Sequence, residues 1–172
     1  MIMIFITGSM FTGKTTWLVN HMNKYHKKDG IFLRPSIDTR ELITHNGLKY
    51  KAKSFENLSQ LGQVFDDKIK AVYIDEVQFM PNVLGYDVAL EQIKLISNIK
   101  PLFLAGLDYD FRKQIFPFSE EIIKICDEVK VLKTYCHICG RLAECYSYKK
   151  NDNLELIEIG GSDLYEPRCF NC

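Results

Sequence analysis

The N-terminal segment constrains the fold more strongly than any other part of the chain. An apolar run, Ile2–Ile6, leads directly into Gly8–Thr15, which reads G-x-x-x-x-G-K-T. The residues after it have a composition compatible with a helix. Strand, glycine-rich loop and helix in this order form a phosphate-binding loop, in which backbone N–H groups and the helix N-terminus point at phosphate oxygens. The segment therefore predicts nucleotide-phosphate binding.

Each residue type in this loop suits that chemistry. Two glycines, Gly8 and Gly13, allow the tight turn. Lys14 supplies positive charge for the β- and γ-phosphates, and the hydroxyl of Thr15 can bind Mg²⁺. The predicted nucleotide-binding residues of the loop are Gly8, Ser9, Met10, Phe11, Thr12, Gly13, Lys14 and Thr15.

Strand-like and helix-like segments alternate through most of the chain. The predicted strands are Ile2–Thr7, Gly30–Arg34, Ala71–Ile74, Pro101–Leu107 and Lys130–Leu132. The predicted helices are Thr15–Lys28, one that starts at Asn57, Val83–Asn98, and Ser119–Asp127 with Ser119 as its N-cap. This alternation predicts an α/β fold of the P-loop NTPase type, with a mostly parallel sheet and helices on both faces.

The composition changes after Lys133, where cysteine pairs and polar alternating segments replace the helices. We expect an ATP-binding α/β domain in residues 1–132 and a small zinc-ribbon-like β domain in residues 133–172. The separation between the cysteine pairs leaves room for a hairpin of Glu144–Lys150 against Leu154–Ile159.

The cysteines of that domain form the pattern C-x-x-C … C-x-x-C. Two such knuckles can place four thiolates around one tetrahedral metal, which suits a structural Zn²⁺ site. Buried reduced thiols, or a single redox pair, are the alternatives. The predicted ligands are Cys136, Cys139, Cys169 and Cys172, and the remaining cysteines, Cys126 and Cys145, are expected in the core.

Two acids follow a buried strand at the end where parallel sheets bind ligands. Asp75 is suited to hold Mg²⁺, and Glu76 is then free to accept a proton from an attacking hydroxyl or water. The alternative is a pair of acids that caps a helix.

A third segment, Asp38-Thr39-Arg40, follows the second predicted strand. Arg40 at this place would clamp phosphate. The alternative is that Arg40 is a solvated loop arginine.

Charge and hydropathy argue against two other classes, nucleic-acid-binding proteins and membrane proteins. The chain carries 22 basic and 22 acidic residues, so it lacks the basic surplus typical of nucleic-acid binders. No apolar run reaches the roughly eighteen residues of a membrane span. The N-terminus lacks the basic flank of a signal peptide. We therefore expect a cytoplasmic protein that binds neither membrane nor nucleic acid, with its cysteines reduced.

Taken in order, these motifs resemble one family over nearly the whole chain, the thymidine kinases of the human cytosolic and bacterial type. The phosphate loop is similar to the family's G-P-M-F-[SA]-G-K-[ST], and Asp38–Arg40 to its D-T-R. Ile74–Phe79 resembles I-D-E-x-Q-F, and Gly106–Arg112 resembles the bacterial G-L-D-x-D-F-R. Ile159–Tyr165 resembles I-G-G-x-[DE]-x-Y, a loop that closes over the thymine.

The resemblance implies ATP-dependent phosphorylation of the 5′-hydroxyl of thymidine. Its catalytic residues would be Glu76 as the base, Lys14 and Arg40. Phosphates and Mg²⁺ would be surrounded by the loop together with Asp38, Thr39, Arg40, Asp75, Glu76, Val77 and Gln78, with Thr15 and Asp75 as the magnesium ligands. The nucleoside would be bound by Met10, Leu107, Phe111, Phe116, Leu156, Ile157, Glu158, Ile159, Gly160 and Tyr165. Tyr146 would lie near the 5-position of the thymine.

The resemblance also implies a homotetramer and a zinc site that anchors the closing loop. Two other functions stay open at this point. One is a kinase for another deoxynucleoside or for a nucleotide, and the other is a P-loop NTPase whose zinc ribbon binds nucleic acid.

Overall fold

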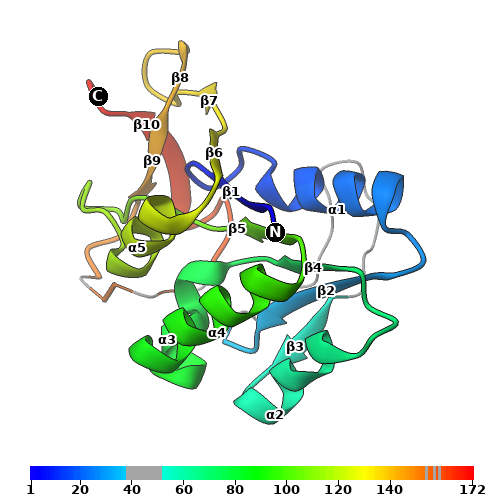
Figure 1. Ribbon diagram of the computed structural model, residues 1–172. Helices are drawn as coiled ribbons and strands as arrows, with labels where there is room; N and C mark the ends of the chain where they lie inside the picture. Colours follow the sequence, from blue (N-terminus) through cyan, green and yellow to red (C-terminus); the bar gives the residue numbers. More distant parts are fainter. Residues whose placement is uncertain (38–51, 154, 157, 159) are drawn as a thin grey trace.

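The computed structural model describes residues 1–37, 52–153, 155, 156, 158 and 160–172. Its main element is a six-stranded parallel sheet in the order β3-β2-β4-β5-β1-β6 (Figure 1). Strands β1, β4 and β5 are fully buried apolar runs, as central strands of a sheet covered on both faces must be. The strands are β1 Met3–Thr7, β2 Gly30–Pro35, β3 Lys53–Phe55, β4 Ala71–Ile74, β5 Leu102–Ala105 and β6 Glu128–Val131.

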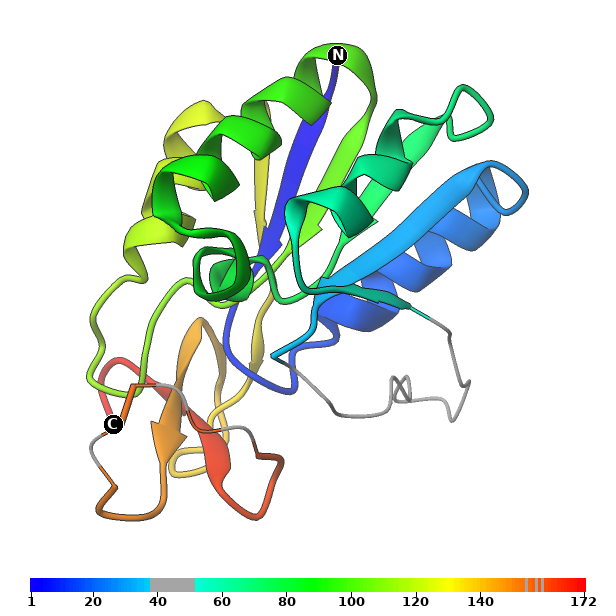
Figure 2. The same ribbon diagram turned by 90° about the horizontal axis from the view of Figure 1, so that it is seen from below.

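Helices cover both faces of this sheet, which confirms the predicted α/β class (Figure 2). The helix α1 packs Leu18 and Met22 on one face, while α4 and α5 pack residues such as Ile93 and Ile122 on the other. The α-helices are α1 Lys14–Tyr25, α2 Leu58–Leu61, α3 Met80–Leu84, α4 Tyr86–Ile99 and α5 Pro117–Ile125, and short 3₁₀ helices cover Gly62–Phe65 and Val77–Phe79. None of the described helices combines the length and apolarity needed to cross a membrane.

Two helix predictions differ from the structure. The single helix expected over Val83–Asn98 is divided into α3 and α4 at Gly85, whose φ of 83° does not continue a right-handed helix. Ser119 is not an N-cap, because α5 already begins at Pro117, a residue suited to the first helical turn. The Ser119 hydroxyl instead donates to the Leu107 carbonyl at 2.6 Å.

The C-terminal region forms two small antiparallel ribbons beyond the carboxyl ends of the parallel strands (Figure 2). Strands β7 Thr134–Tyr135 and β8 Leu142–Ala143 form one, and β9 Cys145–Lys149 and β10 Tyr165–Cys169 form the other. The structure pairs β9 with β10. The predicted hairpin partner, 154–159, contains three residues that lie outside the described ones. The register places Cys145 opposite Cys169, which brings the second cysteine knuckle toward the first.

Candidate active site

The phosphate loop has the backbone geometry that its glycines predict. Gly13 adopts a left-handed φ of 87° at the N-terminus of α1, a conformation that costs glycine little and other residues more. The buried Lys14 side chain turns back over the loop, and its ammonium donates to the carbonyls of Gly8 and Ser9 at 2.9 and 2.6 Å. The structure thus places the positive charge of Lys14 within the loop itself.

Thr15 and Asp75 meet although sixty positions separate them in the sequence. The Thr15 hydroxyl donates to an Asp75 carboxylate oxygen at 2.7 Å. Burial raises the pKa of Asp75 to about 7, the charge of Glu76 contributes to this rise, and the Thr15 hydrogen bond and Lys14 act against it. A buried carboxylate beside a hydroxyl is a set of hard oxygen donors, and a cation placed there would offset the cost of burying the charge.

Glu76 is held in an uncommon conformation. Its φ is 52°, in the left-handed region, and backbone strain of this kind costs about 1–3 kcal/mol and concentrates at functional sites. The Gln78 amide nitrogen donates to the Glu76 carboxylate at 2.7 Å, and the Gln78 amide oxygen accepts the Leu107 N–H at 3.1 Å. Gln78 therefore fixes the Glu76 carboxylate relative to the start of the 107–116 segment, while the Val77 side chain lies in the core.

A pocket opens next to Glu76. The space between its walls, the open mouth included, is about 520 Å³. It is lined by Met10, Glu76, Phe79, Leu107, Tyr109, Asp110, Phe111, Phe116, Ser147, Leu156, Glu158, Gly160 and Tyr165. Every predicted nucleoside-binding residue that the structure describes is in this set. Ile157 and Ile159, together with Asp38, Thr39 and Arg40, lie outside the described residues.

Four lining residues were not predicted: Phe79, Tyr109, Asp110 and Ser147. Phe79 is part of the motif Ile74–Phe79, and Tyr109 and Asp110 are part of the motif Gly106–Arg112. Their positions in these motifs could therefore have identified them. Ser147 could be found only from strand alternation, because side chains on β9 point to opposite sides in turn. For the same reason Tyr146, expected near the thymine, does not line the pocket. It contacts Phe170, with ring centroids 5.8 Å apart.

Hydrogen bonds connect residues that line the pocket, and one of them joins the C-terminal region to the phosphate loop. The Met10 N–H donates to the Ser147 hydroxyl at 2.8 Å. The Tyr165 hydroxyl donates to the Glu158 carbonyl at 2.8 Å, which joins two of the residues that line the pocket. Residues from the two ends of the chain thus form one cavity.

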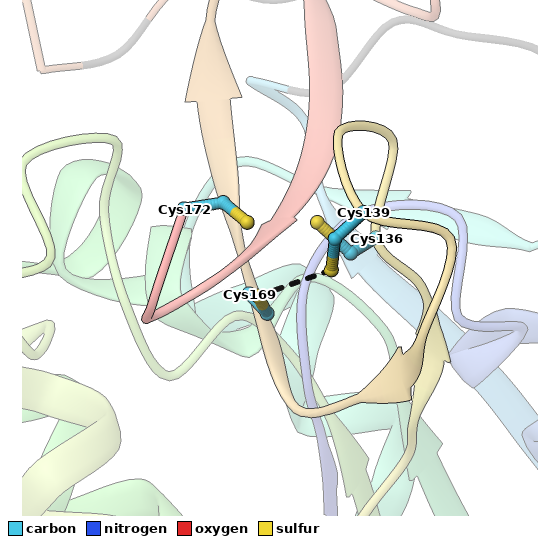
Figure 3. Close-up of side chains that lie close together, drawn as sticks. All are labelled: Cys136, Cys139, Cys169 and Cys172. Atoms are coloured by element: carbon cyan, nitrogen blue, oxygen red, sulfur yellow. Dashed lines mark hydrogen bonds between the residues drawn. The ribbon is translucent and has the colours of Figure 1, made fainter.

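The four predicted cysteine ligands converge in space (Figure 3). Their sulfur atoms all lie within 4.8 Å of one another, and the Sγ atoms of Cys139 and Cys169 are 3.8 Å apart. Four thiolates about 2.3 Å from a tetrahedral zinc ion would be about 3.8 Å apart, so this set fits the metal. The side chain of Arg141 donates to Cys139 Sγ at 3.5 Å and lowers the pKa of that thiol.

Cys126 and Cys145 stay outside this cluster. Cys145 is buried, and burial raises the pKa of its thiol to about 11. Cys126 is half-buried and packs against the larger core. Both therefore belong to the packing, as the sequence predicts.

Comparison with known proteins agrees with this geometry. The sequence model of the thymidine kinase family matches residues 1–172. A thymidine kinase from Choristoneura fumiferana entomopoxvirus is 35% identical, with 97% of this chain and 93% of the relative covered. One from African swine fever virus, isolate Warthog/Namibia, is 32% identical over 97% and 86% of the two chains, and one from Pseudothermotoga lettingae is 31% identical over 97% and 91%. The chain therefore belongs to the thymidine kinase family and phosphorylates thymidine with ATP.

Proposed function

We propose that Glu76 and the phosphate loop transfer the γ-phosphoryl group of ATP to the 5′-hydroxyl of thymidine bound in the pocket described above. One observation carries this assignment: Glu76 and Met10 line the same pocket. Glu76 follows the strand that ends beside the phosphate loop, and Met10 is part of that loop. Phosphoryl donor and acceptor therefore meet at the Glu76 carboxylate.

In this proposal the Glu76 carboxylate accepts the proton of the 5′-hydroxyl as the hydroxyl oxygen attacks the γ-phosphorus. The amide of Gln78 orients that carboxylate. Lys14 and the loop N–H groups stabilise the charge on the phosphate oxygens, and Arg40 adds to this as a clamp. The aromatic side chains Phe111, Phe116 and Tyr165 hold the nucleoside in place and exclude water, which would otherwise hydrolyse ATP.

We assign the metals from the donor sets. Thr15 and Asp75 offer hard oxygen ligands for Mg²⁺, which neutralises phosphate charge when bound. Cys136, Cys139, Cys169 and Cys172 fill all positions of a tetrahedral Zn²⁺, so this metal would stabilise the fold rather than take part in the reaction.

The test is the initial rate of ATP-dependent phosphorylation of thymidine, deoxycytidine and deoxyuridine. We expect thymidine to have the highest kcat/KM, and Glu76→Gln to lower kcat by about 10²–10⁴, the usual contribution of a general base. Glu91→Gln, on an exposed position of α4, is the matched control and should keep the wild-type rate. Wild-type rates in Glu76→Gln would remove the base assignment, and a preference for deoxycytidine would change the assigned substrate.

The assembly is proposed from the family resemblance, and the location and the lack of nucleic-acid binding from the charge and hydropathy of the sequence. We propose a cytoplasmic homotetramer that does not bind nucleic acid. Sedimentation equilibrium of the purified protein should give four times the 20.0 kDa chain mass. A monomer, or salt-dependent binding to DNA, would contradict this assignment.

A further inference from the structure

Lys149 buries its charge beside the pocket. It is the last residue of β9, and its side chain is 1% exposed. Alternation along the strand places it on the same side as Ser147, which lines the pocket, whereas its neighbour Lys150 reaches the Ser162 carbonyl from an exposed position. A buried lysine is rare unless its charge is paired, so its partners indicate its role.

Two of those partners line the pocket. The Lys149 ammonium is 2.6 Å from the Glu158 carboxylate and donates to the Glu155 carbonyl at 2.9 Å. It also lies 5.1 Å from the centre of the Phe111 ring, within the range of a cation–π contact. Glu158 and Phe111 both line the pocket, although they are far apart in the sequence. One ammonium group thus contacts both.

Glu158 is organised around this contact. Hydrogen bonding from Lys149 lowers the pKa of its carboxyl group, and the side-chain amides of Asn151 and Asn153 donate to the same carboxylate at 2.9–3.4 Å. Its backbone carbonyl accepts the Tyr165 hydroxyl. Glu158 is therefore held through its side chain as well as through its main chain.

We propose that Lys149 is a positioning residue for thymidine binding, which holds Glu158 at the pocket and supports the Phe111 ring. Without Glu158 and Glu155 in these positions, the ammonium would lose its carboxylate and a backbone acceptor, and a buried charge without a partner is strongly disfavoured. The pair therefore favours the position of Glu158 at the pocket. This inference rests on the pocket being the thymidine site, as proposed above.

The test compares Lys149→Met, Glu158→Gln and the double variant. We expect each single change to raise the KM for thymidine about tenfold, the equivalent of about 1.4 kcal/mol, because each removes a charged hydrogen bond. The kcat and the KM for ATP should change little, since the phosphate loop is untouched. The double variant should be no worse than the more severe single one, because both act through one contact.

Lys149→Arg keeps the charge and should retain most of the affinity for thymidine. Lys124→Met is the control, since Lys124 is exposed and pairs with Glu120 and Glu121 on α5. If Lys149→Met fails to fold, Glu158→Gln and Lys149→Arg decide the question. An unchanged thymidine KM in Glu158→Gln would overturn the proposal, as would an equal rise in the KM for ATP.

A Phe111→Ala variant separates this proposal from the pocket assignment on which it rests. A raised thymidine KM in Phe111→Ala together with an unchanged one in Glu158→Gln would reject only the role of Lys149. An unchanged KM in Phe111→Ala would reject the pocket itself.

Discussion

Gly106 provides the sharpest test of how Glu76 is held. A Cβ atom at this position would lie 2.5 Å from the Gln78 amide oxygen and 2.9 Å from a Val77 methyl carbon. The backbone of Gly106 is fixed, because its N–H donates to the Ile6 carbonyl at 3.2 Å and its carbonyl accepts the Thr7 hydroxyl at 3.0 Å. A Gly106→Ala change must therefore displace Gln78, whose amide holds the Glu76 carboxylate.

The size of the effect follows from these distances. The new contact is about 1 Å shorter than the separation of about 3.5 Å that nonbonded atoms prefer, so Gln78 must move by a similar amount. A misplacement of about 1 Å at a reacting group can lower the rate about 10²-fold. Overpacking of a filled core costs about 1–3 kcal/mol, which for a chain of this length lowers Tm by about 2–12 °C.

The assay measures kcat for thymidine phosphorylation and Tm by calorimetry for Gly106→Ala and for a control, Gly62→Ala. Gly62 has a right-handed φ of −54°, and the described residues place no atom within 4 Å of a Cβ added there, so alanine should be neutral or slightly stabilising. In a Gln78→Ala background, Gly106→Ala should lower kcat little further. Wild-type kcat and Tm in Gly106→Ala would refute the reasoning that Gln78 positions Glu76.

Two further predictions concern the metal site and pH. The Cys172→Ser variant should lose its bound zinc, which elemental analysis measures. Its Tm should fall, as the Tm of the wild type should fall when a chelator removes the metal. Retention of one zinc ion per chain in the variant would contradict the four-cysteine assignment. Burial lowers the pKa of His21 below its ordinary value of 6.5, so the unfolded chain binds a proton more readily. Stability in urea should therefore fall as the pH decreases through about 6.5, and His21→Gln should reduce that slope. An identical slope in the wild type and in His21→Gln would show that other titratable groups cause the pH dependence.

Local sequence predicted the main elements well, and its failures have both local and distant causes. The pattern over Val83–Asn98 has the spacing of one helix, yet Gly85 within that segment divides it. In the other two cases a distant residue decided the outcome. Ser119 has the chemistry of an N-cap, but the Leu107 carbonyl takes its hydroxyl. A hairpin next to β9 was the simplest local pairing, whereas the structure pairs β9 with the more distant β10.

By itself, the sequence determined the phosphate loop, the acids Asp75 and Glu76, and the two cysteine knuckles. Each is a short segment in which the spacing of neighbouring residues sets the chemistry. Only the tertiary structure decided that Ser147 rather than Tyr146 faces the pocket, that Gln78 joins Glu76 to Leu107, and that Lys149 meets Glu158. The physical reason is strand register, since a shift of one residue turns every side chain to the opposite face, and register depends on pairing between distant parts of the chain.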